Sequence, residues 1–589
     1  MNPPAMNPID MTIAGLRAAY AAGTTPEAVI DAVFRRLAEI DDPGIFISTL
    51  PRGAVAAHVA RLEPADFEAK PLWGVPFAIK DNIDLAGLPT TAACPAFAYE
   101  PAESADAVRR LIDAGAIPIG KTNLDQFATG LVGVRTPWPI PRNAADPALV
   151  PGGSSSGSAV AVAHGIVAFA LGTDTAGSGR VPAALNGIVG LKPTLGAVST
   201  RGVVPACRTL DCVSVFATSV ADAWTVYEAM AGFDAADPYS RRITAGPSGA
   251  LPPVLRIGVP MPAQREFFGD TAAAAAYAAH LEALSAHATL VEIDLEPFLR
   301  VARLLYEGPW VAERFVGLRR FMAAHADDMH PVTRAITQGG QAPSAADAFA
   351  AMYELAALRR TTESTWAAVD ALCVPSIPAV YTVDEVLADP VVLNSRLGIY
   401  TNFVNLLDLC ALAVPGVRRT DGRPAGVTLI APAGRDALIA GIGTAFTGAD
   451  LPATAPSGMI EVVVVGAHMS GLPLNGELTG AGGVFLRATE TAPLYRLHAL
   501  PDCAPPRPGL LRVGETTGRS VPVEVWALPP ESFGRLVAGI PAPLSIGTIE
   551  LADGSSAKGF LAESAGLAGA QDISSFGGWR AFVAAATAA

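Results

Sequence analysis

Two loops rich in glycine and serine, with one lysine upstream, carry the residues of this chain best suited to chemistry. Residues 151–158 read Pro-Gly-Gly-Ser-Ser-Ser-Gly-Ser, and residues 172–180 read Gly-Thr-Asp-Thr-Ala-Gly-Ser-Gly-Arg. Upstream, residues 74–82 read Gly-Val-Pro-Phe-Ala-Ile-Lys-Asp-Asn. Together they offer a nucleophile, a proton relay, a base and backbone donors without a histidine. That combination suits acyl transfer from an amide.

Ser178 is the candidate nucleophile because small residues precede it and allow a tight turn with several N–H groups directed at one point. Such a cluster suits an oxyanion hole, in which one donor lowers the barrier by about 2.7–4 kcal/mol. A serine hydroxyl needs a base, and a lysine serves as one only when burial keeps it neutral. Lys80 ends an apolar run and fits that role. Ser154 can stand between Lys80 and Ser178 and pass the proton.

Three other interpretations of these loops remain open at this stage. Residues 153–157 also fit the G-x-S-x-G nucleophile elbow, which would make Ser155 the nucleophile, but that short motif leaves Lys80 and the second loop unexplained. A phosphate-binding loop is disfavoured because no Gly-Lys-Ser/Thr follows the glycines. The loops as mere turns would not explain three separated motifs that agree in type and spacing.

The three segments closely resemble the amidase signature family of serine amidohydrolases, over about residues 10–445. The resemblance implies a Ser–cis-Ser–Lys triad: Ser154, joined by a cis peptide, as the relay, Lys80 as the base, and Ser178, 24 residues after the relay, as the nucleophile. It implies a supporting ion pair of Asp174 with Arg180, structural rather than chemical. The oxyanion hole is expected from the backbone N–H groups of Thr175, Ala176, Gly177 and Ser178.

Further segments resemble the allophanate hydrolase subfamily, namely residues 123–130, 173–182 and 305–314. The resemblance implies that Tyr306 and Arg314 bind the substrate carboxylate, and a planar guanidinium suits that task because it makes two charge-assisted hydrogen bonds. On spacing alone, the two residues would more often lie on one helix face and only pack and pair. The substrate, allophanate, presents one carboxylate and one terminal amide.

The implied reaction releases ammonia and N-carboxycarbamate in urea degradation. No cofactor and no metal are expected, since HExxH and similar ligand patterns are absent from the sequence. The resemblance also implies a homodimer coupled to a biotin-dependent urea carboxylase. The alternatives are another amidase of the family, a glutamyl-tRNA amidotransferase A-type subunit, or a non-catalytic scaffold that kept the fold.

Composition narrows the class of protein. The chain has 589 residues, 51% of them hydrophobic and 16% charged, and a formal net charge of −14. The negative charge argues against a general nucleic-acid surface, which needs clustered Lys and Arg. Six scattered cysteines without a CxxC, and no basic stretch before an apolar core at the start, favour a cytoplasmic protein with reduced thiols. The apolar run 159–171 is too short to cross a bilayer, so no membrane association is expected.

The elements expected around these loops alternate between helix and strand, which favours an α/β fold with a mixed sheet flanked by helices. Thr25 and Pro26 mark a helix start within a helical segment 9–40. A buried strand over 72–79 would deliver Lys80 at its end. The other expected elements are a helix over 104–115, a strand over 117–120, and helices over 272–288, 297–326 and 344–368.

A linker is expected at 448–457, between an amidase domain at 1–447 and a mostly β domain at 458–589. The second domain resembles the one appended to allophanate hydrolases, with a γ-glutamyl-cyclotransferase-like fold and a role in converting N-carboxycarbamate to carbamate and carbon dioxide. Strands are expected over 461–465 and 521–528. His468, at a strand end, is the candidate for decarboxylation; a structural histidine in a domain that supports assembly is the alternative. No clear equivalent of the cyclotransferase glutamate is present.

Overall fold

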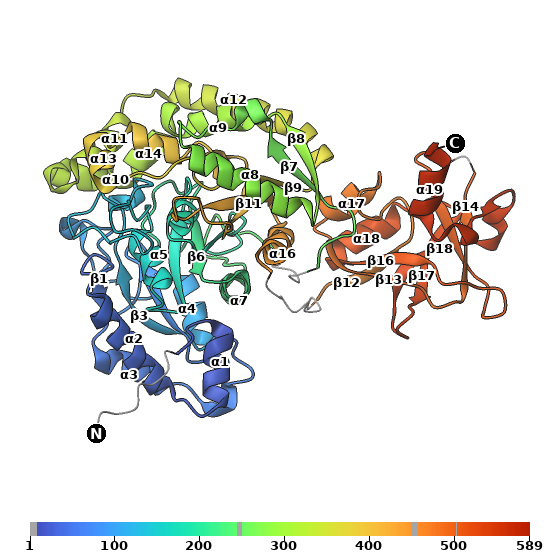
Figure 1. Cartoon of the computed structure of the whole chain (residues 1–589), viewed down its shortest axis with the longest axis horizontal. Helices are drawn as coiled ribbons and strands as arrows, with labels where there is room; N and C mark the ends of the chain where they lie inside the picture. Colours follow the sequence, from blue (N-terminus) through green and yellow to red (C-terminus); the bar gives the residue numbers. More distant parts are fainter. Residues whose placement is uncertain (1–8, 244–249, 449–457, 502, 589) are drawn as a thin grey trace. The chain divides into compact units, whose positions relative to one another are not determined.

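The computed structural model describes residues 9–243, 250–448, 458–501 and 503–588. These residues form two compact units, each described here by itself (Figure 1). Unit 1 takes the described residues within Met1–Ala245, Ile257–Ala286 and Leu290–Asp450. Unit 2 takes those within Gly246–Arg256, His287–Thr289 and Leu451–Ala589. The expected linker lies outside the described residues except for Gly448, and two short earlier segments join unit 2.

Unit 1 is built on a mixed sheet of eleven strands in the order β1-β3-β2-β4-β6-β5-β10-β11-β9-β7-β8. The strands are β1 (Phe46–Thr49), β2 (Pro76–Lys80), β3 (Ile117–Thr122), β4 (Phe169–Asp174), β5 (Val189–Lys192), β6 (Cys212–Ala217), β7 (Arg256–Pro260), β8 (Thr289–Ile293), β9 (Ala371–Pro375), β10 (Leu409–Pro415) and β11 (Gly426–Pro432). Strand β2 lies parallel to both β3 and β4, whereas β4 and β6 are antiparallel. The expected α/β fold with a mixed sheet is confirmed.

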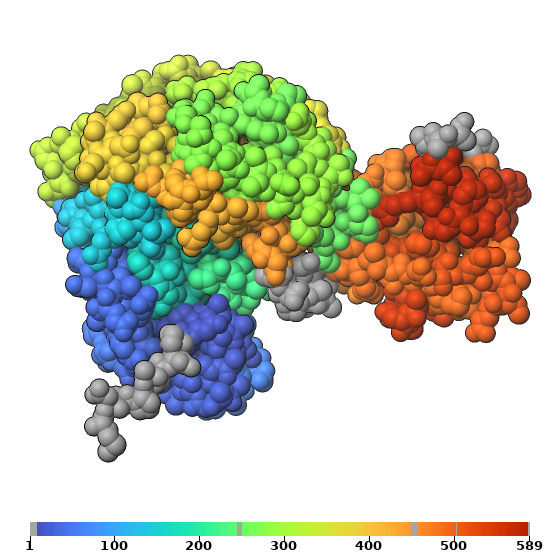
Figure 2. Space-filling model, in the orientation of Figure 1, coloured from blue at the N-terminus to red at the C-terminus, as the bar shows by residue number. Residues whose placement is uncertain are grey.

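Helices cover this sheet and place segments that are distant in sequence side by side. They are α1 (Ile13–Ala21), α2 (Pro26–Ile40), α3 (Arg52–Val59), α4 (Asp106–Asp113), α5 (Ser156–Ala163), α6 (Val181–Leu185), α7 (Val220–Met230), α8 (Thr271–Ser285), α9 (Glu296–Glu307), α10 (Trp310–His325), α11 (Pro331–Gly339), α12 (Ala345–Ala368), α13 (Val383–Ala388), α14 (Val392–Leu397), α15 (Phe403–Leu406) and α16 (Asp436–Thr447). Helices α9 and α12 pack together above the green strands in Figure 1. On the face shown in Figure 2, an orange segment of unit 1 lies between cyan and green ones.

The strand that carries the lysine is buried along its whole length. Every residue of β2 is buried, which explains why this stretch is apolar up to Lys80. Phe77 of β2 stacks on Phe169 of β4, with ring centroids 5.0 Å apart. The lysine therefore emerges at the carboxyl end of a strand between two parallel neighbours, inside the protein.

Two expected helices are each divided in the structure. The segment 9–40 forms α1 and α2, and Thr25 caps α2 by accepting from the Ala28 amide at 3.3 Å, with Pro26 in the first turn as expected. The segment 297–326 forms α9 and α10, because α9 ends at Glu307, and Gly308 and Pro309 separate it from the next helix. Apolar residues recur at helical spacing on either side of each break, so periodicity merges the helices, although Gly23 with Pro26 and Gly308 with Pro309 mark the breaks in the sequence.

Unit 2 is mostly β, as expected. Its strands are β12 (Ile460–Val464), β13 (Val484–Glu490), β14 (Tyr495–Ala499), β15 (Pro508–Arg512), β16 (Pro522–Leu528), β17 (Leu544–Glu550), β18 (Ser556–Ala562) and β19 (Gln571–Asp572). They form a five-stranded sheet in the order β13-β16-β12-β18-β17 and a three-stranded sheet in the order β15-β14-β19. The helices are α17 (Asn475–Gly480), α18 (Pro530–Ala538) and α19 (Trp579–Ala588).

A buried carboxylate anchors the last helix of unit 2. Glu524 of β16 is fully buried and accepts from Ser470, from the Trp526 indole at 3.0 Å and from Arg580 of α19 at 2.7 Å. A buried charge is tolerated only when it is paired and hydrogen-bonded. Arg580 therefore fixes α19 to the sheet.

All six cysteines are free thiols. The apolar run 159–171 is divided between α5 and β4 of the sheet. Within the described ranges, no helix combines the length and hydropathy that a bilayer crossing needs.

Candidate active site

Lys80 and Ser154 meet in the buried centre of unit 1. The Lys80 Nζ donates to Ser154 Oγ and to Thr173 Oγ1, both at 2.7 Å. The side chain of Asn82 donates to the same Thr173 oxygen at 3.4 Å and to the Val204 carbonyl oxygen at 3.2 Å. The Lys80 amino group is thus held by hydroxyl groups from two other segments, and Asn82 holds one of these hydroxyl groups in place.

Burial changes the protonation of this lysine. It lowers the pKa of Lys80 to about 7, against the opposing effect of the Asp125, Asp174 and Asp211 carboxylates, and the charge of Arg314 lowers it further. A lysine with such a pKa is partly neutral near pH 7 and can then accept a proton. The expected burial of Lys80 is confirmed.

The peptide bond between Gly153 and Ser154 is cis, as the family resemblance implied. The Ser154 carbonyl oxygen accepts from the Asp125 amide at 3.0 Å. The Asp125 carboxylate in turn accepts from the amides of Gly133 and Arg135, each at 2.9 Å. A side chain at residue 153 would meet the Asp125 carboxylate, so only glycine fits there.

The loop that carries Ser178 is organised around the Asp174 carboxylate. Asp174 accepts from the Gly177 amide at 2.9 Å and the Gly179 amide at 3.0 Å. It also accepts two hydrogen bonds from Arg180, both at 2.9 Å, in a fully buried bidentate pair. Although burial raises the pKa of Asp174, Arg180 and the amides more than offset this and hold it below its ordinary value. The expected supporting pair is present and shapes the loop.

Three of the four expected oxyanion-hole amides are available to a ligand. Those of Thr175, Ala176 and Ser178 donate to no acceptor among the residues that the structure describes. The Gly177 amide differs from the expectation, because Asp174 already accepts from it. Gly177 instead supplies its positive φ of 135° and leaves space for the Thr401 side chain, which a Cβ would clash with.

The second link of the proposed relay is not a hydrogen bond in this structure. The Ser178 hydroxyl pairs with no group in the described part of the chain, Ser154 included. Ser155, the nucleophile of the elbow interpretation, donates to the Thr173 carbonyl oxygen at 3.3 Å and is fully buried. This pattern favours a structural role for Ser155, and catalytic hydrogen bonds often close only when substrate binds.

Residues far along the chain hold the nucleophile loop from outside, and sequence reasoning missed them. Thr401 donates to the Ala176 carbonyl oxygen at 2.6 Å. Asn405 donates to the Asp174 carbonyl oxygen at 2.8 Å. Asp211 accepts from the Thr175 hydroxyl at 2.6 Å, and burial raises the pKa of Asp211 to about 6. No sequence motif marks these positions. Of the residues that hold the site, Thr173 alone lies within a quoted motif, because it precedes Asp174 in the second loop.

Tyr306 and Arg314 lie on two successive helices and not on one helix face. The turn at Gly308 between α9 and α10 brings the Arg314 Cζ to 5.8 Å from the Tyr306 ring centroid. The buried Arg314 donates to Thr129 Oγ1 at 2.9 Å and to the Ala128 carbonyl oxygen at 3.3 Å. None of these partners is a carboxylate, which leaves the guanidinium charge available to an anionic ligand.

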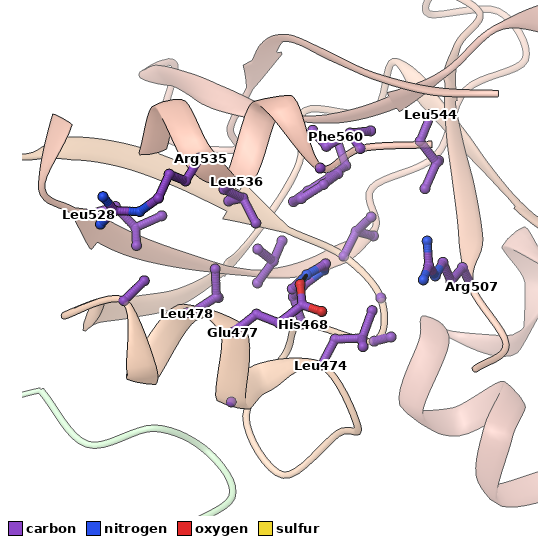
Figure 3. Close-up of a pocket in the computed structure, with 18 of the residues that line it drawn as sticks. His468, Leu474, Glu477, Leu478, Arg507, Leu528, Arg535, Leu536, Leu544 and Phe560 are labelled. Atoms are coloured by element: carbon purple, nitrogen blue, oxygen red, sulfur yellow. Dashed lines mark hydrogen bonds and ion pairs between the residues drawn. The ribbon is translucent and has the colours of Figure 1, made fainter. Parts of the chain in front are cut away.

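His468 lines a cavity of about 610 Å³ in unit 2 (Figure 3). It follows β12, and its Nε2 lies 2.9 Å from Glu477 Oε2 of α17. Its ring stacks on Phe560 of β18, with centroids 5.0 Å apart. Burial lowers the pKa of His468, against the opposing effect of Glu477, and this favours the neutral imidazole.

Comparison with known proteins assigns this arrangement to a family. Residues 28–439 match the family model described as Amidase. The chain belongs to the amidase family. Residues 460–584 of this amidase match the model described as the allophanate hydrolase C-terminal domain. The two matches fall on opposite sides of the undescribed residues 449–457.

Individual relatives of this amidase are of two kinds. The urea amidolyase of Lachancea kluyveri is 43% identical over 550 residues, which cover 88% of the chain and 30% of that relative. The chain thus spans about a third of the length of the first curated relatives. The A-type subunit of a glutamyl-tRNA(Gln) amidotransferase from Deinococcus deserti is 34% identical over 75% of the chain and 96% of that relative.

A solved structure matches this amidase along nearly its whole length. The Kluyveromyces lactis allophanate hydrolase superimposes with a TM-score of 0.78 at 39% identity. The match covers 98% of this chain and 99% of that one. The similarity therefore includes both units.

Proposed function

We propose that this chain is an allophanate hydrolase that acts in urea degradation, with Ser178, Ser154 and Lys80 as its catalytic triad. The observation that carries the proposal is the 2.7 Å hydrogen bond between Lys80 and Ser154, beside a nucleophile loop with three free amides. The match to the Kluyveromyces lactis allophanate hydrolase over 98% of the chain supports the substrate.

In the proposed reaction, Ser178 Oγ attacks the carboxamide carbon of allophanate. Its proton passes through Ser154 to neutral Lys80, and the oxyanion accepts hydrogen bonds from the amides of Thr175, Ala176 and Ser178. The tetrahedral intermediate collapses, the carbon–nitrogen bond breaks, and ammonia leaves with the proton returned from Lys80. Water then attacks the acyl-enzyme by the same proton route and releases N-carboxycarbamate.

Arg314 and Tyr306 are proposed to bind the carboxylate of allophanate. A guanidinium without a carboxylate partner holds a carboxylate with charge-assisted hydrogen bonds. The charge of Arg314 already acts on Lys80, which supports its position near the reacting groups. Binding the carboxylate would fix which end of the substrate reaches Ser178.

For unit 2 we propose a γ-glutamyl-cyclotransferase-like domain, bounded as the sequence predicted at 458–589, that converts N-carboxycarbamate to carbamate and carbon dioxide. His468, neutral and set in a cavity, supports this role. The urea amidolyase relatives support coupling to a biotin-dependent urea carboxylase. We also propose that the protein forms a homodimer and binds no nucleic acid.

The second candidate is a glutamyl-tRNA amidotransferase A-type subunit, favoured by the relatives of that name. Those relatives match about three-quarters of the chain, whereas the allophanate hydrolase structure matches both units. Unit 2 therefore weighs against this candidate.

The test is ammonia release from allophanate, malonamate, biuret and glutamine at equal concentrations. Allophanate is expected to be the best substrate and malonamate the next, because both carry a carboxylate beside a terminal amide, while biuret lacks the carboxylate. Faster release from glutamine would favour the amidotransferase candidate. No turnover of allophanate above the Ser178→Ala background would refute the proposal.

A further inference from the structure

The cavity of unit 2 contains an arginine that no described residue neutralises. Arg507 lines the cavity beside β15, and its Nε is buried without an acceptor in the described part of the chain. No described carboxylate forms an ion pair with it. A buried nitrogen without a partner has lost its hydration, as is also true of the Arg580 Nε, but the Arg507 guanidinium has no described carboxylate partner either, so its charge is open to an anionic ligand.

Other arginines of unit 2 provide the contrast. Arg487, Arg496, Arg512 and Arg580 each pair with a carboxylate, at 3.0, 2.6, 2.6 and 2.7 Å respectively. The second arginine of the cavity, Arg535, donates only to the neutral Ser532 hydroxyl, at 3.0 Å. Two arginines without a described carboxylate partner therefore line this one cavity.

His468 lies between these two arginines in Figure 3, with Arg507 on one side and Arg535 on the other. Glu477 and Phe560 fix its ring, as described above, and Glu477 is the single carboxylate in the described lining. The charge of Arg507 acts on His468 and lowers its pKa, which supports their proximity. With a neutral histidine, two arginines and one glutamate, the lining carries net positive charge in a chain of net charge −14.

The rest of the lining is mostly apolar. Leu474, Leu478, Leu528, Leu536, Leu544 and Phe560 surround the charged groups. Charge-assisted hydrogen bonds are strengthened where apolar walls displace water. The cavity therefore suits an anion, and a planar guanidinium matches the geometry of a carboxylate.

We propose that Arg507 binds one carboxylate of a small dicarboxylate dianion and holds it against His468. The inference rests on the proposed function of unit 2, since N-carboxycarbamate is such a dianion. Arg507 would fix one carboxylate while the other faces the imidazole. The role is one of binding, and it leaves the chemistry of unit 1 unchanged.

The probe is malonate, a stable dianion with the shape of N-carboxycarbamate, titrated calorimetrically into the full chain. Arg314→Ala serves as the background, so that unit 1 does not bind the probe. Arg507→Gln in that background is expected to weaken malonate binding by about tenfold to 100-fold. Arg507→Lys should lose less, and Arg512→Gln, an arginine of unit 2 outside the cavity, should change nothing.

Equal malonate affinity with and without Arg507→Gln, or no malonate binding in the Arg314→Ala background, would overturn the proposal. Propionate, a monoanion of similar size, is expected to bind at least about tenfold more weakly than malonate; equal binding would also contradict it. Unchanged thermal unfolding of the Arg507 variants excludes misfolding. Malonate binding is measured without turnover, so failure of the unit 1 proposal, seen as no ammonia release from allophanate by the unsubstituted chain, is distinguishable from failure of this inference.

Discussion

The nucleophile loop of unit 1 and the cavity of unit 2 differ in how completely their charged groups are paired. In the loop, Asp174 is saturated by two amides and a bidentate Arg180. In the cavity, Arg507 has no described partner and Arg535 has only a serine. The first region is preorganised before substrate arrives, and the second is completed by the ligand.

This difference in the pairing of charged groups predicts different effects of substitutions in the two regions. A preorganised loop stabilises a transition state without reorganisation, so its residues are expected to affect turnover. An incompletely paired cavity gains its hydrogen bonds on binding, so its residues are expected to affect affinity. Four substitutions or conditions test this division.

Removing the nucleophile should have the largest effect. Ser178→Ala is expected to lower kcat for ammonia release by about 10⁴-fold or more, because no other group can form the acyl-enzyme. Ser155→Ala is the matched control from the neighbouring loop and should lose less than about tenfold, since that hydroxyl binds only backbone. A large loss in Ser155→Ala alone would restore the elbow interpretation.

The second largest effect is expected from altering the Asp174 carboxylate, which organises the loop. Asp174→Asn is expected to lower kcat by about 10²–10³-fold, because one acceptor oxygen is replaced by a donor and the free amides lose their alignment. Glu477→Gln in unit 2 should leave the rate of release of the first ammonia, from the carboxamide, unchanged. Steady-state assays of both variants, with thermal unfolding to confirm folding, decide whether the two regions act separately.

Weakening carboxylate recognition should cost less and should depend on the substrate. Arg314→Lys is expected to lower kcat/KM for allophanate by about 10–100-fold, because an ammonium group cannot reproduce a bidentate contact. Neutral biuret should be hydrolysed equally well by both proteins. Equal losses for the two substrates would show that Arg314 acts on the loop and not on the carboxylate.

The smallest expected effect is a shift of the acid limb of the pH profile. With the pKa of Lys80 at about 7, kcat/KM should fall about tenfold per pH unit as the lysine is protonated below that value. Because the Arg314 charge lowers this pKa, Arg314→Gln should move the acid limb to higher pH. A pH–rate profile whose acid limb is unaffected by Arg314→Gln would place the two groups too far apart to interact.

Much of the candidate site could be predicted from the sequence because its residues lie in short contiguous motifs. Lys80, Ser154 and Ser178 follow from loop composition and spacing, and the parallel strands β2 and β4 bring them together. The positions of Thr401, Asn405 and Asp211 could not be predicted, since their hydrogen bonds to the loop depend on the packed fold. The Gly177 amide was assigned to the oxyanion hole because its hydrogen bond to Asp174 is invisible in a motif.

Helix limits were predicted less well than strand positions. The breaks at residues 22–25 and at Gly308 interrupt helices whose apolar periodicity continues on both sides. The Gly308 break matters for the site, because it turns an eight-residue spacing along one helix into a contact between two helices. For unit 2, the sequence indicated His468, but the partners Glu477, Phe560 and Arg507 come from separate elements.

Unit 2 is not encoded by one continuous stretch of the gene, because it includes the short segment that contains Val254. The Val254 amide donates to Ser470 Oγ at 3.3 Å, and the Val254 side chain fills the space beside Gly471. A gene fragment encoding residues 458–589 alone would omit this segment, some two hundred positions upstream. Recombination between related genes would therefore preserve the contacts of Val254 with Ser470 and Gly471 more readily when one fragment carries both segments.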